Sequence, residues 1–94
     1  MPLYAIHCLD KPNSLELRLT TRERHLAYVT THPTFRMGGP YLNAEGQAVG
    51  SLIFIEAEDE AAAKAFCAGD PYGQAGLFEV VEIRPWAYAG GKLP

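Results

Sequence analysis

The spacing of hydrophobic and polar positions along the chain predicts four strands and two helices. Three apolar or alternating runs are rich in β-branched and aromatic residues, which is typical of strands, and a short fourth run precedes a glycine and proline turn. One further stretch has apolar residues at intervals of three and four, and another is rich in alanine, so both favour helix. In chain order the predicted elements are a strand over 3–9, a helix over 15–31, a strand over 34–38, a strand over 51–57, a helix over 60–67 and a strand over 77–83.

This order of elements is that of the split β-α-β, or ferredoxin-like, motif, an α+β fold. In this motif an antiparallel sheet carries both helices on one face. The other face must be covered, and the predicted strands have apolar residues on both sides. We therefore expect a homodimer in which a second copy covers the helix-free face.

The first predicted helix carries two kinds of residue along neighbouring lines. Its apolar residues form one stripe, which we expect to face the core: Leu15, Leu19, Leu26 and Val29. Arg18, Arg22 and His25 follow at spacings of four and three along one edge of the same helix, beside that stripe. Three groups that carry or can acquire positive charge therefore project the same way.

Composition limits the architecture and the partners. With 94 residues, of which 48% are hydrophobic and 20% charged, the chain is long enough for one core only, so we expect a single domain over 1–94 with a loose tail from about 89. The formal charge of −3 and the lack of a long basic run argue against a nucleic-acid partner. No run approaches the roughly 18 apolar residues of a membrane span, and the N-terminus has no signal pattern, so we expect a cytoplasmic protein.

The two cysteines, Cys8 and Cys67, occur without a paired-cysteine motif or a cluster of metal-ligand spacing. They fit a reducing cytoplasm, and we expect neither a metal nor another cofactor. His7 stands beside Cys8, but neighbours on a strand point to opposite faces and do not easily share an ion.

His25 and Asp70 are the candidate acid and base. Asp70 comes where the second helix stops and is followed by Pro71, so its carboxylate is directed away from that helix. A carboxylate beside an imidazole fixes its tautomer and raises its basicity. The simpler interpretations are a surface histidine and an ordinary turn, and Asp10, at the end of the first strand, likewise suggests a cap or turn.

Short stretches throughout the chain together resemble the YCII-related proteins. These are Tyr4-Ala5, Asp10-Lys11-Pro12, Ser14-Leu15 with Arg18 and Arg22, His25-Leu26, Gly39-Pro40, Gly50-Ser51, Asp70-Pro71-Tyr72 and Ala75-Gly76-Leu77-Phe78. The resemblance implies the dimeric α/β-barrel type of ferredoxin-like fold, as in muconolactone isomerase. It also implies an active site on a His-Asp pair, which falls on His25 and Asp70, with Ser51 near it.

One branch of that family removes chloride from a chlorinated hydroxyhydroquinone, so the resemblance implies elimination, isomerisation or hydrolysis of a small cyclic or anionic molecule. In such an enzyme His25 is the general acid or base, and Arg18 or Arg22 attracts the anion. Ser51 and Tyr72 are hydrogen-bond donors to the substrate, although the ring of Tyr72 could simply pack. The two arginines could instead pair with Glu16 or Glu23 on a solvated face.

The alternative function is a dimeric module that binds a small ligand without catalysis, in which the His-Asp pair is only structural. The two functions differ in one observable feature. An enzyme needs His25 to be reachable from a cavity, whereas a structural pair would be sealed by side chains.

Overall fold

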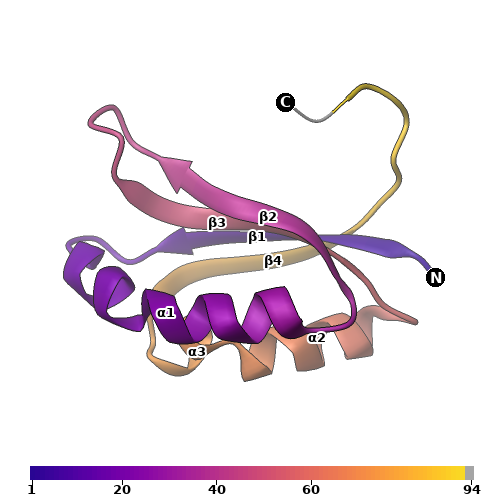
Figure 1. The fold of residues 1–94 in the computed structure, drawn as a ribbon, viewed down its shortest axis with the longest axis horizontal. Helices are drawn as coiled ribbons and strands as arrows, with labels where there is room; N and C mark the ends of the chain where they lie inside the picture. Colours follow the sequence, from indigo (N-terminus) through magenta and orange to yellow (C-terminus); the bar gives the residue numbers. More distant parts are fainter. Residues whose placement is uncertain (93–94) are drawn as a thin grey trace.

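The computed structural model describes residues 1–92 as a four-stranded antiparallel sheet with its helices on one face (Figure 1). The strand order is β2-β3-β1-β4, so β1 is central. In chain order the elements are β1 (Leu3–Asp10), α1 (Leu15–Thr31), β2 (Phe35–Leu42), β3 (Ala48–Glu56), α2 (Glu60–Gly69), α3 (Pro71–Gln74) and β4 (Phe78–Trp86). The predicted ferredoxin-like α+β fold is confirmed. Residues 87–92 form no helix or strand, and the end of the predicted loose tail, residues 93–94, lies outside the described residues.

Two parts of the fold differ from the expectation. The segment between the predicted strands 34–38 and 51–57 is largely a hairpin, because β2 continues to Leu42 and β3 begins at Ala48. The Asn43 side-chain oxygen accepts hydrogen bonds from the backbone N–H groups of Glu45 and Gln47, which shapes the tip, and Gly46 has the positive φ of 78° that the turn requires. The second difference is the extra helical turn α3, which carries Tyr72.

The core lies between the sheet and the helices. Alternate residues of β1 and β3 point to the helices, and one side each of α1 and α2 packs on them. The buried members are Tyr4, Ile6, Cys8, Val29, Ile53, Ile55, Ala57, Ala63 and Phe66. Asp59 caps α2, since its carboxylate accepts a hydrogen bond from the Ala62 N–H at 2.8 Å.

The expected core face of α1 is correct for Val29 but wrong for Leu19 and Leu26. The residues that α1 buries are Arg18, Thr21, His25 and Val29, at spacings of three and four, whereas Leu19 is 59% exposed and Leu26 is 37% exposed. A hydrophobic pattern ranks leucine above arginine and histidine for burial. Here, however, Arg18 and His25 find buried hydrogen-bond partners, which offset the cost of removing them from water.

Cys8 predicts a loss of stability at alkaline pH. Burial, with smaller contributions from nearby Cys67 and Asp70, raises the pKa of the Cys8 thiol from 9.0 to about 12. Between these values the folded chain keeps a proton that the unfolded chain releases, so stability is complete below pH 9 and falls toward pH 12 by up to about 1.4 kcal/mol per pH unit. We expect Cys8→Ala to flatten this slope in urea unfolding curves. An unchanged slope in that variant would assign the alkaline loss to other groups, Cys67 among them.

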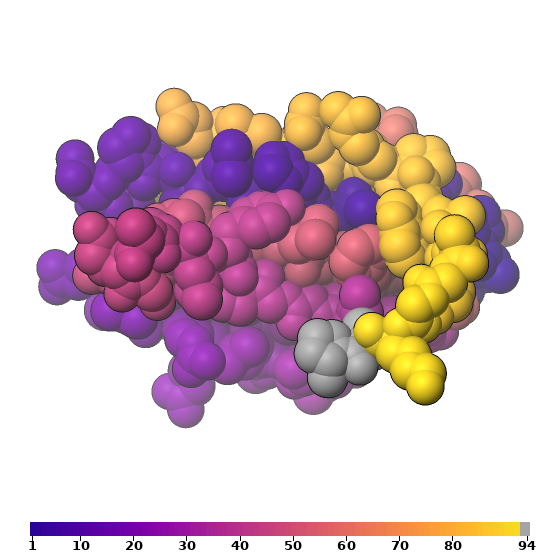
Figure 2. Space-filling view, turned by 90° about the horizontal axis from the view of Figure 1, so that it is seen from above, coloured from indigo at the N-terminus to yellow at the C-terminus, as the bar shows by residue number. Residues whose placement is uncertain are grey.

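Figure 2 looks onto the face of the sheet that no helix covers, here called the helix-free face. Its central position is Leu52 of β3, which lies between His7 of β1 and Gly39 of β2 in the register. Next to it along β3, the ring of Phe54 lies 4.6 Å from that of Trp86 in β4. This face is therefore rich in apolar side chains.

Among residues 1–92 no helix is long and apolar enough to span a membrane.

Candidate active site

His25 of α1 and Asp70 are hydrogen-bonded in the interior, with 2.7 Å between the His25 Nδ1 and Asp70 Oδ1 atoms. Asp70 is the residue between α2 and α3, and the same oxygen accepts the backbone N–H of Tyr72 at 3.0 Å. Pro71 occupies the first position of α3, where its missing N–H costs nothing. The turn that begins α3 thus holds the carboxylate against the imidazole.

The hydrogen bond fixes the tautomer of neutral His25. A carboxylate acceptor at 2.7 Å requires the proton on Nδ1, so Nε2 keeps its lone pair. Among residues 1–92, every polar side-chain atom that is sealed from solvent has a hydrogen-bond partner. The Nε2 atom of His25 has no hydrogen-bond partner among these residues, so it is not sealed from solvent. Nε2 therefore reaches the surface of the cavity that His25 lines.

The ring of Tyr72 of α3 contacts both a histidine and an arginine. Its ring lies 3.9 Å from the His25 ring with an angle of 18° between the planes, and the Arg18 guanidinium carbon lies 4.6 Å from its centroid. Burial raises the pKa of Tyr72, although the charges of Arg18 and Arg22 act in the opposite direction. The phenol is therefore neutral at neutral pH and can donate a hydrogen bond.

Arg18 is held by a carboxylate of β1. Its Nε and Nη2 atoms donate to the two Asp10 oxygens at 2.6 and 2.9 Å, and Nη2 also donates to the Ser51 hydroxyl at 3.0 Å. Burial alone lowers the pKa of Arg18, but the hydrogen bonds and charge of Asp10 outweigh it and keep the pKa above its ordinary value. Arg18 is thus a permanent, charge-balanced cation that bridges β1, β3 and the ring of Tyr72.

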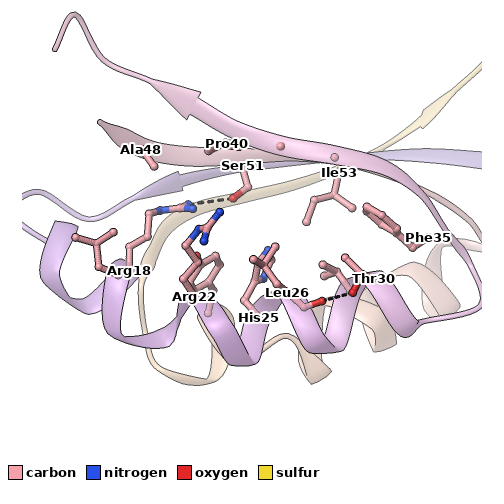
Figure 3. Close-up of a pocket in the computed structure, with 15 residues that line it drawn as sticks. Arg18, Arg22, His25, Leu26, Thr30, Phe35, Pro40, Ala48, Ser51 and Ile53 are labelled. Atoms are coloured by element: carbon pink, nitrogen blue, oxygen red, sulfur yellow. Dashed lines mark hydrogen bonds between the residues drawn. The ribbon is translucent and has the colours of Figure 1, made fainter. Parts of the chain in front are cut away.

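These groups border a cavity of about 300 Å³ between α1 and the β2–β3 hairpin. In Figure 3, Arg18, Arg22 and His25 project from α1 toward Ser51 and Ile53 of β3. The larger apolar side chains of the wall are those of Leu19, Leu26, Val29, Phe35, Pro40 and Ile53. The cavity is therefore a largely apolar space with cationic and hydrogen-bonding groups at one end.

The structure places all six residues that the sequence suggested in or beside this cavity. Five line it, namely Arg18, Arg22, His25, Ser51 and Tyr72, and Asp70 lies behind His25. Sequence reasoning missed Asp10, which it took for a cap or turn. The available signal was only that an arginine, Arg18, follows eight residues later, and the sequence does not show that it is buried. Neither Arg18 nor Arg22 pairs with Glu16 or Glu23.

A metal centre has no support in the residues that the structure describes. Residues 1–92 contain no group of three or more histidine, cysteine, aspartate or glutamate side chains that could hold an ion. His7 contacts Tyr41, with 2.8 Å between Nδ1 and the phenol oxygen, rather than sharing a site with Cys8.

Fold and site together define a ferredoxin-like α+β domain with a small-molecule cavity on one side of its sheet. Residues 2–87 match the model of the YCII-related domain, and the chain belongs to that family. It is 39% identical over 93 residues to Protein YciI of Escherichia coli O6:H1, a match that covers 89% of this chain and 95% of the relative.

Solved structures agree with this assignment. The chain is similar to 5-chloro-2-hydroxyhydroquinone dehydrochlorinase from Burkholderia phenoliruptrix AC1100, solved with 2,5-dihydroxybenzoquinone. The TM-score is 0.86 and the identity is 31%, over 93% of this chain and 95% of that one. An antibiotic biosynthesis monooxygenase shares the fold alone, with a TM-score of 0.60 and 11% identity over 96% of this chain and all of that one.

Proposed function

We propose that the chain is an enzyme that moves a proton on a small cyclic or anionic molecule, with His25 as the acid or base. The observation that carries this proposal is the His25 ring, which is fixed by Asp70 through Nδ1 while Nε2 reaches the cavity. A sealed structural pair would have no such access. The geometry therefore favours the enzyme over a binding module without catalysis.

Among elimination, isomerisation and hydrolysis, elimination has the best support because a dehydrochlorinase is 31% identical and similar over nearly the whole chain. In the proposed step the substrate loses a proton and a chloride ion. The proton passes to His25 Nε2, the chloride leaves to solvent, and Asp70 stabilises the imidazolium that forms. Tyr72 and Ser51 serve as hydrogen-bond donors at the polar end of the cavity.

Chloride release from 5-chloro-2-hydroxyhydroquinone tests this proposal. The purified chain is expected to release one chloride per substrate molecule, faster than the same solution without protein. The control uses 2,5-dihydroxybenzoquinone, for which only binding is measured. Binding of this quinone without any acceleration of chloride release would favour the non-catalytic module instead.

We also propose that the chain forms a homodimer through the helix-free face. The register places apolar side chains of all four strands there, including Met37, Leu52, Phe54 and Trp86. A domain of this size buries only about 60–65% of the surface of its unfolded chain, so burial of a second apolar face adds substantially to stability. A second copy of the chain has the same apolar face exposed, and two such faces can cover each other in a symmetric dimer.

The oligomeric state of Leu52→Lys tests the dimer. We expect wild-type protein to sediment as a dimer and the variant as a monomer, because a lysine at the centre of the face places an unpaired charge in the interface. Leu17→Lys is the control, since Leu17 is an exposed leucine on α1, on the opposite side of the sheet. A wild-type monomer would reject the dimer, and a dimer that survives in Leu52→Lys but is lost in Leu17→Lys would assign the contact to another surface.

A further inference from the structure

Among the described residues, the titratable side chains at the polar end of the cavity are cationic, basic or phenolic, and none is a carboxylate. Asp10 and Asp70 each contact a cationic or basic side chain of α1, and neither carboxylate is part of the cavity wall. Arg18 and Arg22 both line it. A molecule in the cavity therefore meets guanidinium groups directly, while the balancing carboxylates lie behind them.

The two arginines differ in how far they are neutralised. Arg18 donates two hydrogen bonds to Asp10 at 2.6 and 2.9 Å and a third to Ser51, so its charge is matched and its geometry is fixed. Arg22, one helical turn later, makes no ion pair or hydrogen bond with any residue that the structure describes. In Figure 3 it nevertheless reaches into the same space as Arg18. Arg22 is thus the unmatched cation of the cavity.

The remaining wall suits a compact apolar body. Leu26, Phe35 and Pro40 come from two elements on opposite sides of the space, and the volume of about 300 Å³ is at the lower end of small-molecule sites. That volume accommodates one ring with a few substituents. The polar end, where Arg22 lies, also contains the His25 ring.

We propose that the cavity selects molecules with one ring-sized apolar body and a negatively charged group, and that Arg22 recognises the charge. Arg18 is then a positioning residue for Ser51 and Tyr72 rather than the anion receptor. This inference rests on the proposed function, because it concerns the same cavity and names the class of ligand that the cavity binds. It concerns binding, so it does not depend on the reaction.

Three probes of nearly equal size and different charge test this selection: benzoate, benzamide and benzylamine. We expect benzoate to bind about tenfold more tightly than benzamide, because a charge-assisted hydrogen bond to a partly exposed arginine is worth roughly that factor. Benzylamine is expected to bind more weakly still. NMR titration locates the binding, since resonances of His25, Leu26 and Tyr72 should shift together.

The matched variants are Arg22→Gln and Arg24→Gln, which lower the net charge equally. Arg24 is an exposed residue of the same helix and does not line the cavity. We expect the preference for benzoate to disappear in Arg22→Gln and to remain in Arg24→Gln. Equal binding of benzoate and benzamide, equal losses in both variants, or binding of no probe would overturn the proposal.

Failure of this inference is distinguishable from failure of the proposed function. Chloride release that depends on His25, together with no charge preference among the probes, would contradict the role of Arg22 alone. Conversely, an Arg22-dependent preference for benzoate in a chain that accelerates no reaction would keep the ligand class and reject the enzyme.

Discussion

Replacement of His25 by asparagine is expected to lower kcat by roughly 10²–10⁴-fold while the protein stays folded, because a positioned acid or base contributes about that factor. The asparagine amide nitrogen can occupy the place of Nδ1 and keep the hydrogen bond to Asp70, which is 2.7 Å long in the wild type. It has no atom at the place of Nε2, so the base at the cavity is lost. Chloride release and a urea unfolding curve of the same preparation measure the two effects.

The control for this substitution is His32→Asn. His32 follows α1, contacts Thr34 through Nδ1 and does not line the cavity, so its loss should leave kcat nearly unchanged. Asp70→Asn is expected to give an intermediate loss. Its retained Oδ1 can still accept from the imidazole and from the Tyr72 N–H, but its charge no longer stabilises the imidazolium. Full activity in His25→Asn would remove His25 from the reaction.

The strands with the strongest patterns were predictable from the sequence. β1 and β3 carry dense β-branched and aromatic residues, and their predicted positions agree with the structure within a few residues. β2 was predicted too short because Gly38, Gly39 and Pro40 have low strand propensity. Its pairing with β3 is a tertiary contact that overrides local preference.

The candidate site was predictable in its residues and in the His25–Asp70 pair, which the family resemblance implied, but not in the pairing of Arg18 with Asp10. A hydrophobic pattern cannot reveal that Arg18 is buried, because the hydrogen-bond partners that offset the cost of its burial are Asp10 on β1 and Ser51 on β3. Ser51 is 33 positions away in sequence, and Asp70 is 45 positions from His25. For the same reason, the exposure of Leu19 and Leu26 can be predicted only when it is known that α1 buries its polar side.

Arg18→Met is expected to lower the free energy of unfolding by about 3–5 kcal/mol, because it leaves the Asp10 carboxylate without its partner in the interior. The side chains of Arg18 and Asp10 are only 4% and 5% exposed, so solvent replaces the lost hydrogen bonds poorly. Ser51 also loses a donor, and the ring of Tyr72 loses the cation that covers it. In a domain whose total stability is typically about 5–15 kcal/mol, this is a large fraction.

A matched exposed pair and a double variant separate the loss of the ion pair from the loss of its partner. Arg36→Met breaks the pair with Glu56, whose side chains are 43% and 31% exposed, and should cost at most about 1 kcal/mol. Asp10→Leu combined with Arg18→Met should recover most of the stability that Arg18→Met loses, because no carboxylate is then left unpaired. Urea unfolding of the four proteins measures these differences. If the double variant is no more stable than Arg18→Met, the contacts of Arg18 with Ser51 and Tyr72, rather than its pair with Asp10, hold this end of α1 against the sheet.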